Sequence, residues 1–170
     1  LTSLQIQALT TAQVNAMHAD QIASISASGV SALTTTQITG LTAAIDLLAG
    51  LSTAQIPALS AANVAILTAN QLNALSTTQI NSLSATQAKA LSGTQITALT
   101  TENLVALSFS AIANLSTSAL STISTTQLQY LTTAQMQGLT TTAVRALSTD
   151  QIVALTTAQA SSLTTAQISS

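Results

Sequence analysis

Charged side chains are nearly absent from this sequence. Of its 170 residues, two are Lys or Arg and four are Asp or Glu, so 4% are charged, whereas ordinary globular proteins have roughly 25%. Binding to nucleic-acid phosphates requires clustered Lys and Arg, so we expect no nucleic-acid partner. The chain also has one His, no Cys and only 1% aromatic residues. Because general acids, general bases and metal ligands are so few, we predict no enzyme, no cofactor and no metal site.

Long apolar runs are also missing, although hydrophobic residues make up 47% of the chain. A membrane-spanning helix needs about 20 consecutive apolar residues, whereas Ser, Thr and Gln interrupt this sequence every few positions. The longest apolar stretch, residues 45–51, is itself broken by Asp46 and Gly50. We therefore expect no membrane span.

An eight-residue repeat organises the chain. Residues 1–40 form five octets, residues 41–50 form one irregular ten-residue unit, and residues 51–170 form fifteen further octets. Position 1 is Leu in 18 of these 21 units, position 2 is Ser or Thr in 20, position 5 is Gln in 14, and position 6 is nearly always a large aliphatic residue. Neither end shows a polar, atypical capping repeat. We interpret residues 1–170 as a single array within a longer array or a fibre.

The period of eight is incompatible with one continuous α-helix. Eight residues overshoot two helical turns by about 80°, so the Leu column would spiral around the helix and leave no buried stripe. A β-solenoid with a corner at the Leu is an alternative. Thr and Ile favour strands, whereas the high Ala and Gln content disfavours them.

A string of very short capped helices accounts for more of the pattern. If Ser or Thr at position 2 is the N-cap, Gln at position 5 is the third helical residue and completes a capping box. Leu at position 1 and Ile or Val at position 6 are then the two partners of a hydrophobic staple. The charges agree with this register. Acidic residues fall in the first turn and basic residues in the last turn, where the helix dipole favours them: Asp20, Glu102, Asp150, Lys89 and Arg145.

The sequence therefore predicts an all-α solenoid with one short helix at positions 3 to 8 of each unit, and a β-solenoid is the alternative. Isolated helices shorter than about 12 residues are marginal in water, so the units must stack and share one core of Leu and Ile columns. Two, three or four units per coil all fit the pattern. Pro57 at position 7 removes one backbone hydrogen bond, which predicts a helix that ends early or tightens. The unit 41–50 predicts a longer helix or a bulge.

Three residues that depart from the repeat are candidate sites. His18 replaces the cap residue and lies two residues before Asp20, but a metal or catalytic pair of these two residues lacks a third ligand. We interpret His18 as a substituted cap and assign no catalytic, cofactor-binding or metal residue. Phe109 and Tyr130 are single aromatics, which indicate either a lateral contact or a tolerated substitution.

The octet Leu-Ser/Thr-x-x-Gln-Ile/Val-x-Ala resembles, over all 170 residues, the tandem tracts of very long bacterial surface or secreted adhesin-like proteins. The stretches LSTDQIVAL and LTTAQ also resemble the first helix of TAL-effector repeats, a likeness that we attribute to shared capping chemistry. The first resemblance implies an extracellular or cell-surface structural protein that forms a filament, sheath or adhesin stalk through self-association. The alternative is a binding module whose Thr rows contact ice or a carbohydrate surface.

Overall fold

The computed structural model describes residues 1–41 and 44–169. Within these residues the chain forms 20 short α-helices and one 3₁₀ helix, and no strand. The elements in chain order are α1 (Ser3–Ala8), α2 (Thr11–Asn15), α3 (Ala19–Ala23), α4 (Ala27–Ser31), α5 (Thr35–Thr39), α6 (Ala44–Gly50), η1 (Ile56–Ala58), α7 (Ala61–Ala65), α8 (Ala69–Asn73), α9 (Thr77–Asn81), α10 (Ala85–Ala90), α11 (Gly93–Ala98), α12 (Thr101–Ala106), α13 (Phe109–Asn114), α14 (Thr117–Ser121), α15 (Thr125–Tyr130), α16 (Thr133–Gly138), α17 (Thr141–Arg145), α18 (Thr149–Val153), α19 (Thr157–Ser162) and α20 (Thr165–Ile168). The predicted all-α array is confirmed, and the β-solenoid alternative is wrong.

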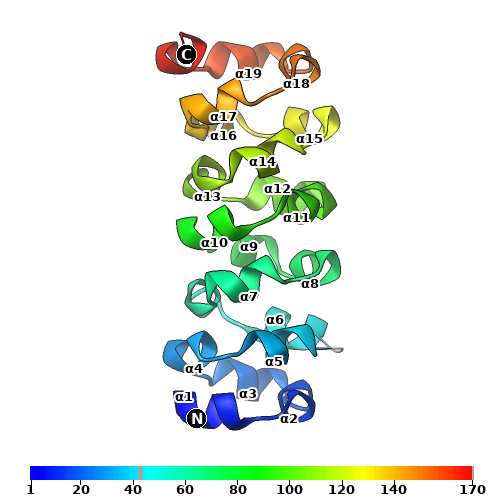
Figure 1. Ribbon diagram of the computed structural model, residues 1–170, viewed down its shortest axis with the longest axis vertical. Coiled ribbons are helices and arrows are strands. Elements are labelled where there is room, and N and C mark those ends of the chain that lie inside the picture. Colours follow the sequence, from blue (N-terminus) through cyan, green and yellow to red (C-terminus); the bar gives the residue numbers. More distant parts are fainter. Residues whose placement is uncertain (42–43, 170) are drawn as a thin grey trace.

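Each element packs on the third element further along the chain, for example α7 on α10, α10 on α13 and α13 on α16. Three consecutive elements therefore make one coil, a number that the sequence left open between two and four. Figure 1 shows the result, a narrow stack that the chain climbs from its N-terminal end to its C-terminal end. The helices form a solenoid in which, among the described residues, each coil packs on the coils before and after it.

The helices are short because each unit both stops one helix and starts the next. After α10, Leu91 and Ser92 are extended, with ψ of 131° and 161°. The Ser92 hydroxyl then accepts a hydrogen bond from the backbone N–H of Gln95 at 3.2 Å. This bond satisfies an N–H that has no partner within the new helix. Of the helices whose caps the structure describes, all α-helices except α3 begin with a Ser or Thr bond of this kind.

The core consists of the two predicted columns. In the middle of the stack, Leu83 and Leu91 at position 1 and Ile80 and Ile96 at position 6 are all buried. They belong to one continuous cluster that runs from Ile6 to Val144. No unit buries these side chains alone, so the stability of each helix comes from the coils that flank it.

The two irregular units resolve the alternatives that the sequence left open. The ten-residue unit forms a longer helix, because α6 has seven residues where the other helices have four to six. The unit with Pro57 tightens instead of ending early: its last turn is the 3₁₀ helix η1, with Pro57 in its first turn. The Leu59 N–H closes this turn on the Ile56 carbonyl at 3.1 Å.

Position 8 is small for a reason that the repeat alone does not reveal. Small residues there accommodate position 3 of the unit three places away. The Phe109 ring lies over Gly138, where an added Cβ would be 3.0 Å from the ring carbons. At Gly93 the small residue is at position 3, and the bulkier residue that it faces, Thr122, is at position 8. The two positions therefore fit together as a large and a small partner across neighbouring coils.

This packing predicts that the effect of Gly138→Ala on the free energy of unfolding changes sign with the residue at position 109. Gly138→Ala alone should destabilise the chain by about 1 kcal/mol, because the new methyl group overlaps the Phe109 ring. In a Phe109→Ser background the same change should stabilise it by up to about 1 kcal/mol, because Ala favours a helix over Gly. Urea unfolding of the four proteins of this double-mutant cycle measures the coupling. Equal effects of Gly138→Ala in both backgrounds would contradict the proposed fit.

Candidate functional site: an inter-coil amide ladder and a lateral groove

The Gln of position 5 forms hydrogen bonds in two directions. Gln87 is buried, and its Oε1 accepts the Ser84 backbone N–H at 2.8 Å, as the predicted capping box requires. Its Nε2 donates to the carbonyls of Ile56 and Leu59, both at 2.8 Å. These carbonyls lie at the junction between two units, one coil earlier. One amide therefore closes the start of its own helix and binds the end of a helix in the neighbouring coil.

The same arrangement recurs along the stack. Nε2 donates to carbonyls 28 to 33 residues earlier from Gln37, Gln55, Gln71, Gln79, Gln95, Gln127, Gln135, Gln151, Gln159 and Gln167. These bonds satisfy helix-end carbonyls that would otherwise be buried without a partner. We call this set, together with Gln87, the amide ladder.

Units with Asn at position 5 show which half of the interaction is retained. The shorter Asn63 and Asn103 side chains do not complete a capping box. They still reach the preceding coil: Asn63 Nδ2 donates to the Leu33 carbonyl at 2.8 Å, and Asn103 Nδ2 lies 3.4 Å from the Leu75 carbonyl. The bond between coils is thus kept where the bond within the helix is lost.

The predicted capping box gives Gln a role only at its own cap, and the ladder is an additional role that the repeat did not predict. A signal was nevertheless present. Glu completes a capping box as well as Gln does, and an anion near a helix N-terminus is favoured, yet no unit has Glu at position 5. A carboxylate has no N–H to donate. The consistent choice of an amide indicates that the donor is needed.

A second set of polar bonds ties coils together on the outside. Position 7 side chains donate to the position 8 carbonyl 25 residues later: Asn73 Nδ2 to Ala98, Asn81 Nδ2 to Ala106 and Gln129 Nε2 to Ala154, at 2.8 to 3.0 Å. Asn73 Oδ1 also accepts the Thr100 backbone N–H at 3.0 Å. The outer bonds point toward the C-terminal end, whereas the amide ladder points toward the N-terminal end.

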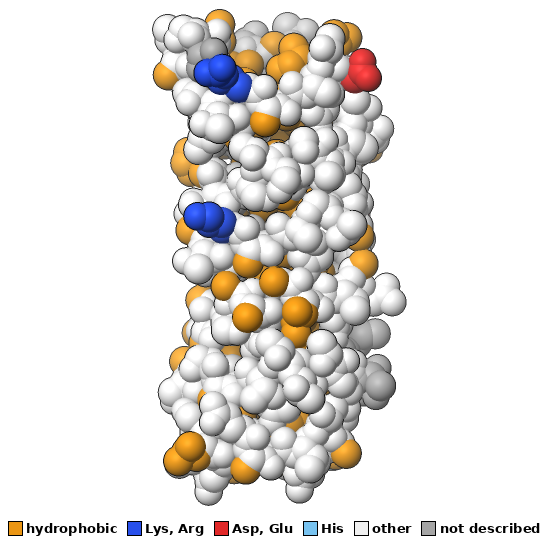
Figure 2. All heavy atoms as spheres, in the orientation of Figure 1, with side chains coloured by type: hydrophobic (Ala, Val, Ile, Leu, Met, Phe, Trp, Pro, Cys, Tyr) orange, Lys and Arg blue, Asp and Glu red, His pale blue; other side chains and the backbone are white. Residues whose placement is uncertain are grey.

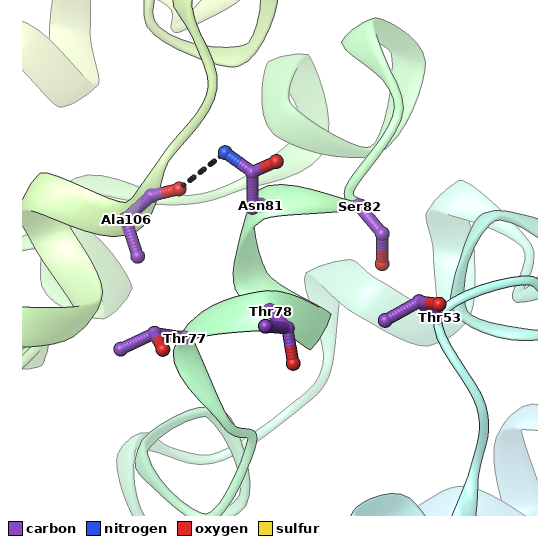
Figure 3. A pocket seen from close by; sticks show the side chains of 6 residues that line it. All are labelled: Thr53, Thr77, Thr78, Asn81, Ser82 and Ala106. Atoms are coloured by element: carbon purple, nitrogen blue, oxygen red, sulfur yellow. Dashed lines mark hydrogen bonds between the residues drawn. The ribbon is translucent and has the colours of Figure 1, made fainter.

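A lateral groove of about 450 Å³ interrupts the regular surface. It is lined by Thr53, Thr77, Thr78, Asn81, Ser82 and Ala106, and Figure 3 shows these side chains with the Asn81–Ala106 hydrogen bond at one edge. The groove lies along α9, with Thr53 of the unit that contains η1 and Ala106 at the end of α12 also lining it. The lining is hydroxyl-rich and uncharged.

The three candidate residues His18, Phe109 and Tyr130 lie on the surface. The His18 backbone N–H donates to Gln21 Oε1 at 2.9 Å, so half of the capping box remains, but the imidazole forms no capping bond. Among the described residues, no three His, Cys, Asp or Glu side chains gather as a metal site requires. Phe109 and Tyr130 are 56% and 52% exposed.

Figure 2 shows a largely uncharged face with scattered apolar side chains. None of the described helices has the length and apolar character needed to cross a bilayer.

The amide ladder predicts that Gln87→Glu is costly and pH-dependent. The carboxylate would face two carbonyls in a buried site, so we expect a loss of about 2 kcal/mol or more at neutral pH. Burial raises the pKa of such a carboxyl in the folded state. The loss should therefore be smallest below the ordinary Glu pKa of about 4.3 and grow as the pH rises through that value. Thermal unfolding between pH 3 and 8 measures it. Gln5→Glu, at the same position in an exposed site, is the matched control and should change little.

The surface position of His18 generates a second prediction. His18→Ala and Asp20→Ala should leave divalent-metal binding unchanged and alter only the local stability of α3, because two ligands on one turn make a weak site. Calorimetric titration with Zn²⁺ measures this. Micromolar binding that disappears in these variants would contradict the prediction.

Comparison with known proteins agrees with the repeat. The ALTTAQ repeat family matches residues 46–77, 69–101 and 133–165. No curated protein and no solved structure shows a significant match to the chain. The three matched regions together cover more than half of the 170 residues. The chain therefore belongs to the ALTTAQ repeat family.

Proposed function

We propose that this chain is a structural spacer, a rod-like segment of an extracellular or cell-surface filament, sheath or adhesin stalk. The observation that supports this best is the amide ladder, which joins each coil to the next through buried hydrogen bonds beside a continuous apolar core. Stability in such a stack comes from nearest-neighbour contacts. Adding octets lengthens the rod without changing its cross-section.

The surface chemistry supports a passive structural role. With a formal net charge of −2, little electrostatic repulsion opposes contact between neighbouring rods. The described residues include no cluster of titratable side chains that would perform acid–base or metal chemistry. At the start of each α-helix with a described Ser or Thr cap, the position 2 hydroxyl is engaged in that cap, as Ser92 is with the Gln95 N–H.

The groove beside η1 favours a second candidate function, the binding of a carbohydrate. Its threonine, serine and asparagine side chains are of the kind that pair with sugar hydroxyls. The groove occurs at one place, however, whereas ladder bonds recur from Gln37 to Gln167. An ice-binding lattice receives less support, because the cap hydroxyls face the backbone.

A distance measurement tests the spacer proposal. The chain has no Cys, so spin labels can be attached at chosen sites. Thr142→Cys is combined in turn with Ser118→Cys, Thr94→Cys and Asn70→Cys, all at exposed position 4 and one, two and three coils away. A rod requires three narrow distance distributions in a ratio of about 1:2:3. Broad distributions that do not scale with the number of coils would contradict the proposal.

The proposed location needs a separate test. Antibodies raised against residues 1–170 should label intact, unpermeabilised source cells or their external fibres in immunogold electron microscopy. Labelling only after permeabilisation would show that the rod lies inside the cell.

A further inference from the structure

We propose that the lateral groove binds an uncharged saccharide, whose hydroxyl groups are recognised by the side chains of Thr53, Thr77 and Asn81. This inference rests on the second candidate function, carbohydrate binding, and names the class of ligand and the residues that select it. The groove has a volume of about 450 Å³, which lies within the roughly 300–1,000 Å³ that small-molecule sites occupy.

The groove is lined from both sides of the most loosely packed junction in the stack. Among the described elements, the packing of each element on the third one along the chain is loosest between η1 and α9. Thr53 precedes η1, and Thr77 begins α9. The helix α9 is nevertheless held by bonds to two other units: Gln79 Nε2 donates to the Leu51 carbonyl at 2.6 Å, and Asn81 Nδ2 donates to a carbonyl of α12 at 3.0 Å. This wall of the groove is therefore fixed before a ligand binds, which lowers the entropic cost of binding.

Three polar groups at the groove are available to a ligand. The hydroxyls of Thr53 and Thr77 and the Oδ1 of Asn81 are exposed and have no hydrogen-bond partner among the described residues. The equivalent Asn73 differs, because its Oδ1 accepts the Thr100 backbone N–H at 3.0 Å. Figure 3 shows the Asn81 amide with its nitrogen toward α12 and its oxygen turned to the other side. The oxygen of Asn81 is thus an uncommitted acceptor at the edge of the groove.

These groups match the chemistry of a sugar that has no charge. A sugar hydroxyl donates one hydrogen bond and accepts others, a Thr hydroxyl does the same, and an amide oxygen accepts. The methyl groups of the Thr side chains and of Ala106 offer apolar contact to the C–H groups of a sugar ring. The two basic residues of the chain, Lys89 and Arg145, do not line the groove. A carboxylate or sulfate on the ligand would therefore lose hydration without a cation to compensate it.

Two matched double variants test the site. Thr53→Val with Thr77→Val removes two hydroxyls from the groove and keeps the branched shape of both side chains. Thr125→Val with Thr149→Val makes the same change at position 3 of α15 and α18, where both residues are exposed and lie outside the groove. The 170-residue chain, labelled with ¹⁵N, is titrated with neutral trisaccharides of glucose, galactose, mannose and N-acetylglucosamine, and with trigalacturonic acid as the acidic probe. Amide NMR shifts measure the affinity and locate the site, and circular dichroism verifies folding.

At least one neutral trisaccharide should shift the amide signals of the groove residues. Its affinity should fall at least about fivefold in the groove variant and stay unchanged in the control variant. An equal affinity in the groove variant and the parent, or an equal loss in both variants, would overturn the inference. Equally tight binding of trigalacturonic acid at the same residues would also overturn it but would leave carbohydrate binding in place. If none of the probes binds, both the inference and the carbohydrate candidate fail. The spacer proposal stands in every case, because it depends on distances along the rod.

Discussion

The whole array depends on the ability of a neutral primary amide to accept and donate hydrogen bonds at the same time. A helix of five or six residues leaves most of its backbone groups unpaired at both ends, and stacking such helices buries those groups. In Gln87 the oxygen satisfies the start of one helix and the nitrogen satisfies the end of another. Neither a carboxylate nor a hydroxyl of similar reach performs both tasks in an apolar interior without leaving a costly unpaired group.

The hydrogen bonds within each unit were predictable from the sequence, whereas the hydrogen bonds between coils were not. The capping box, the position of each helix and the choice of the Leu and Ile columns as the apolar positions all follow from residues within eight positions of each other. The partners of Nε2 lie 28 to 33 residues away, and identifying them requires knowing that three units make a coil. The sequence carries that number only indirectly, in pairs such as Phe109 with Gly138 and Gly93 with Thr122, which are 29 residues apart. Gly40 with Thr11 is a third pair of this kind, and three pairs among 21 units were too few to recognise without the coordinates.

The same distinction explains the groove and the irregular units. Pro57 predicts a local disturbance because it lacks an N–H, but the consequence of that disturbance lies on the neighbouring coils, where Thr77 and Asn81 line the groove. The longer helix α6 immediately precedes the shortened unit. The amide ladder nevertheless continues through both units: Gln55, inside the tightened unit, donates to the Ile25 carbonyl, and Gln79 donates to the Leu51 carbonyl.

The ladder also gives the stack of coils a direction. Within every coil the amides point toward the N-terminal end and the position 6 side chains toward the C-terminal end, so the two faces of a coil are complementary but different. A stack of such coils has no internal point at which it must stop, because each added coil satisfies the one before it and exposes the same surface again. Stability is then a sum over neighbouring coils, so opening a coil inside the stack costs its contacts with both of its neighbours.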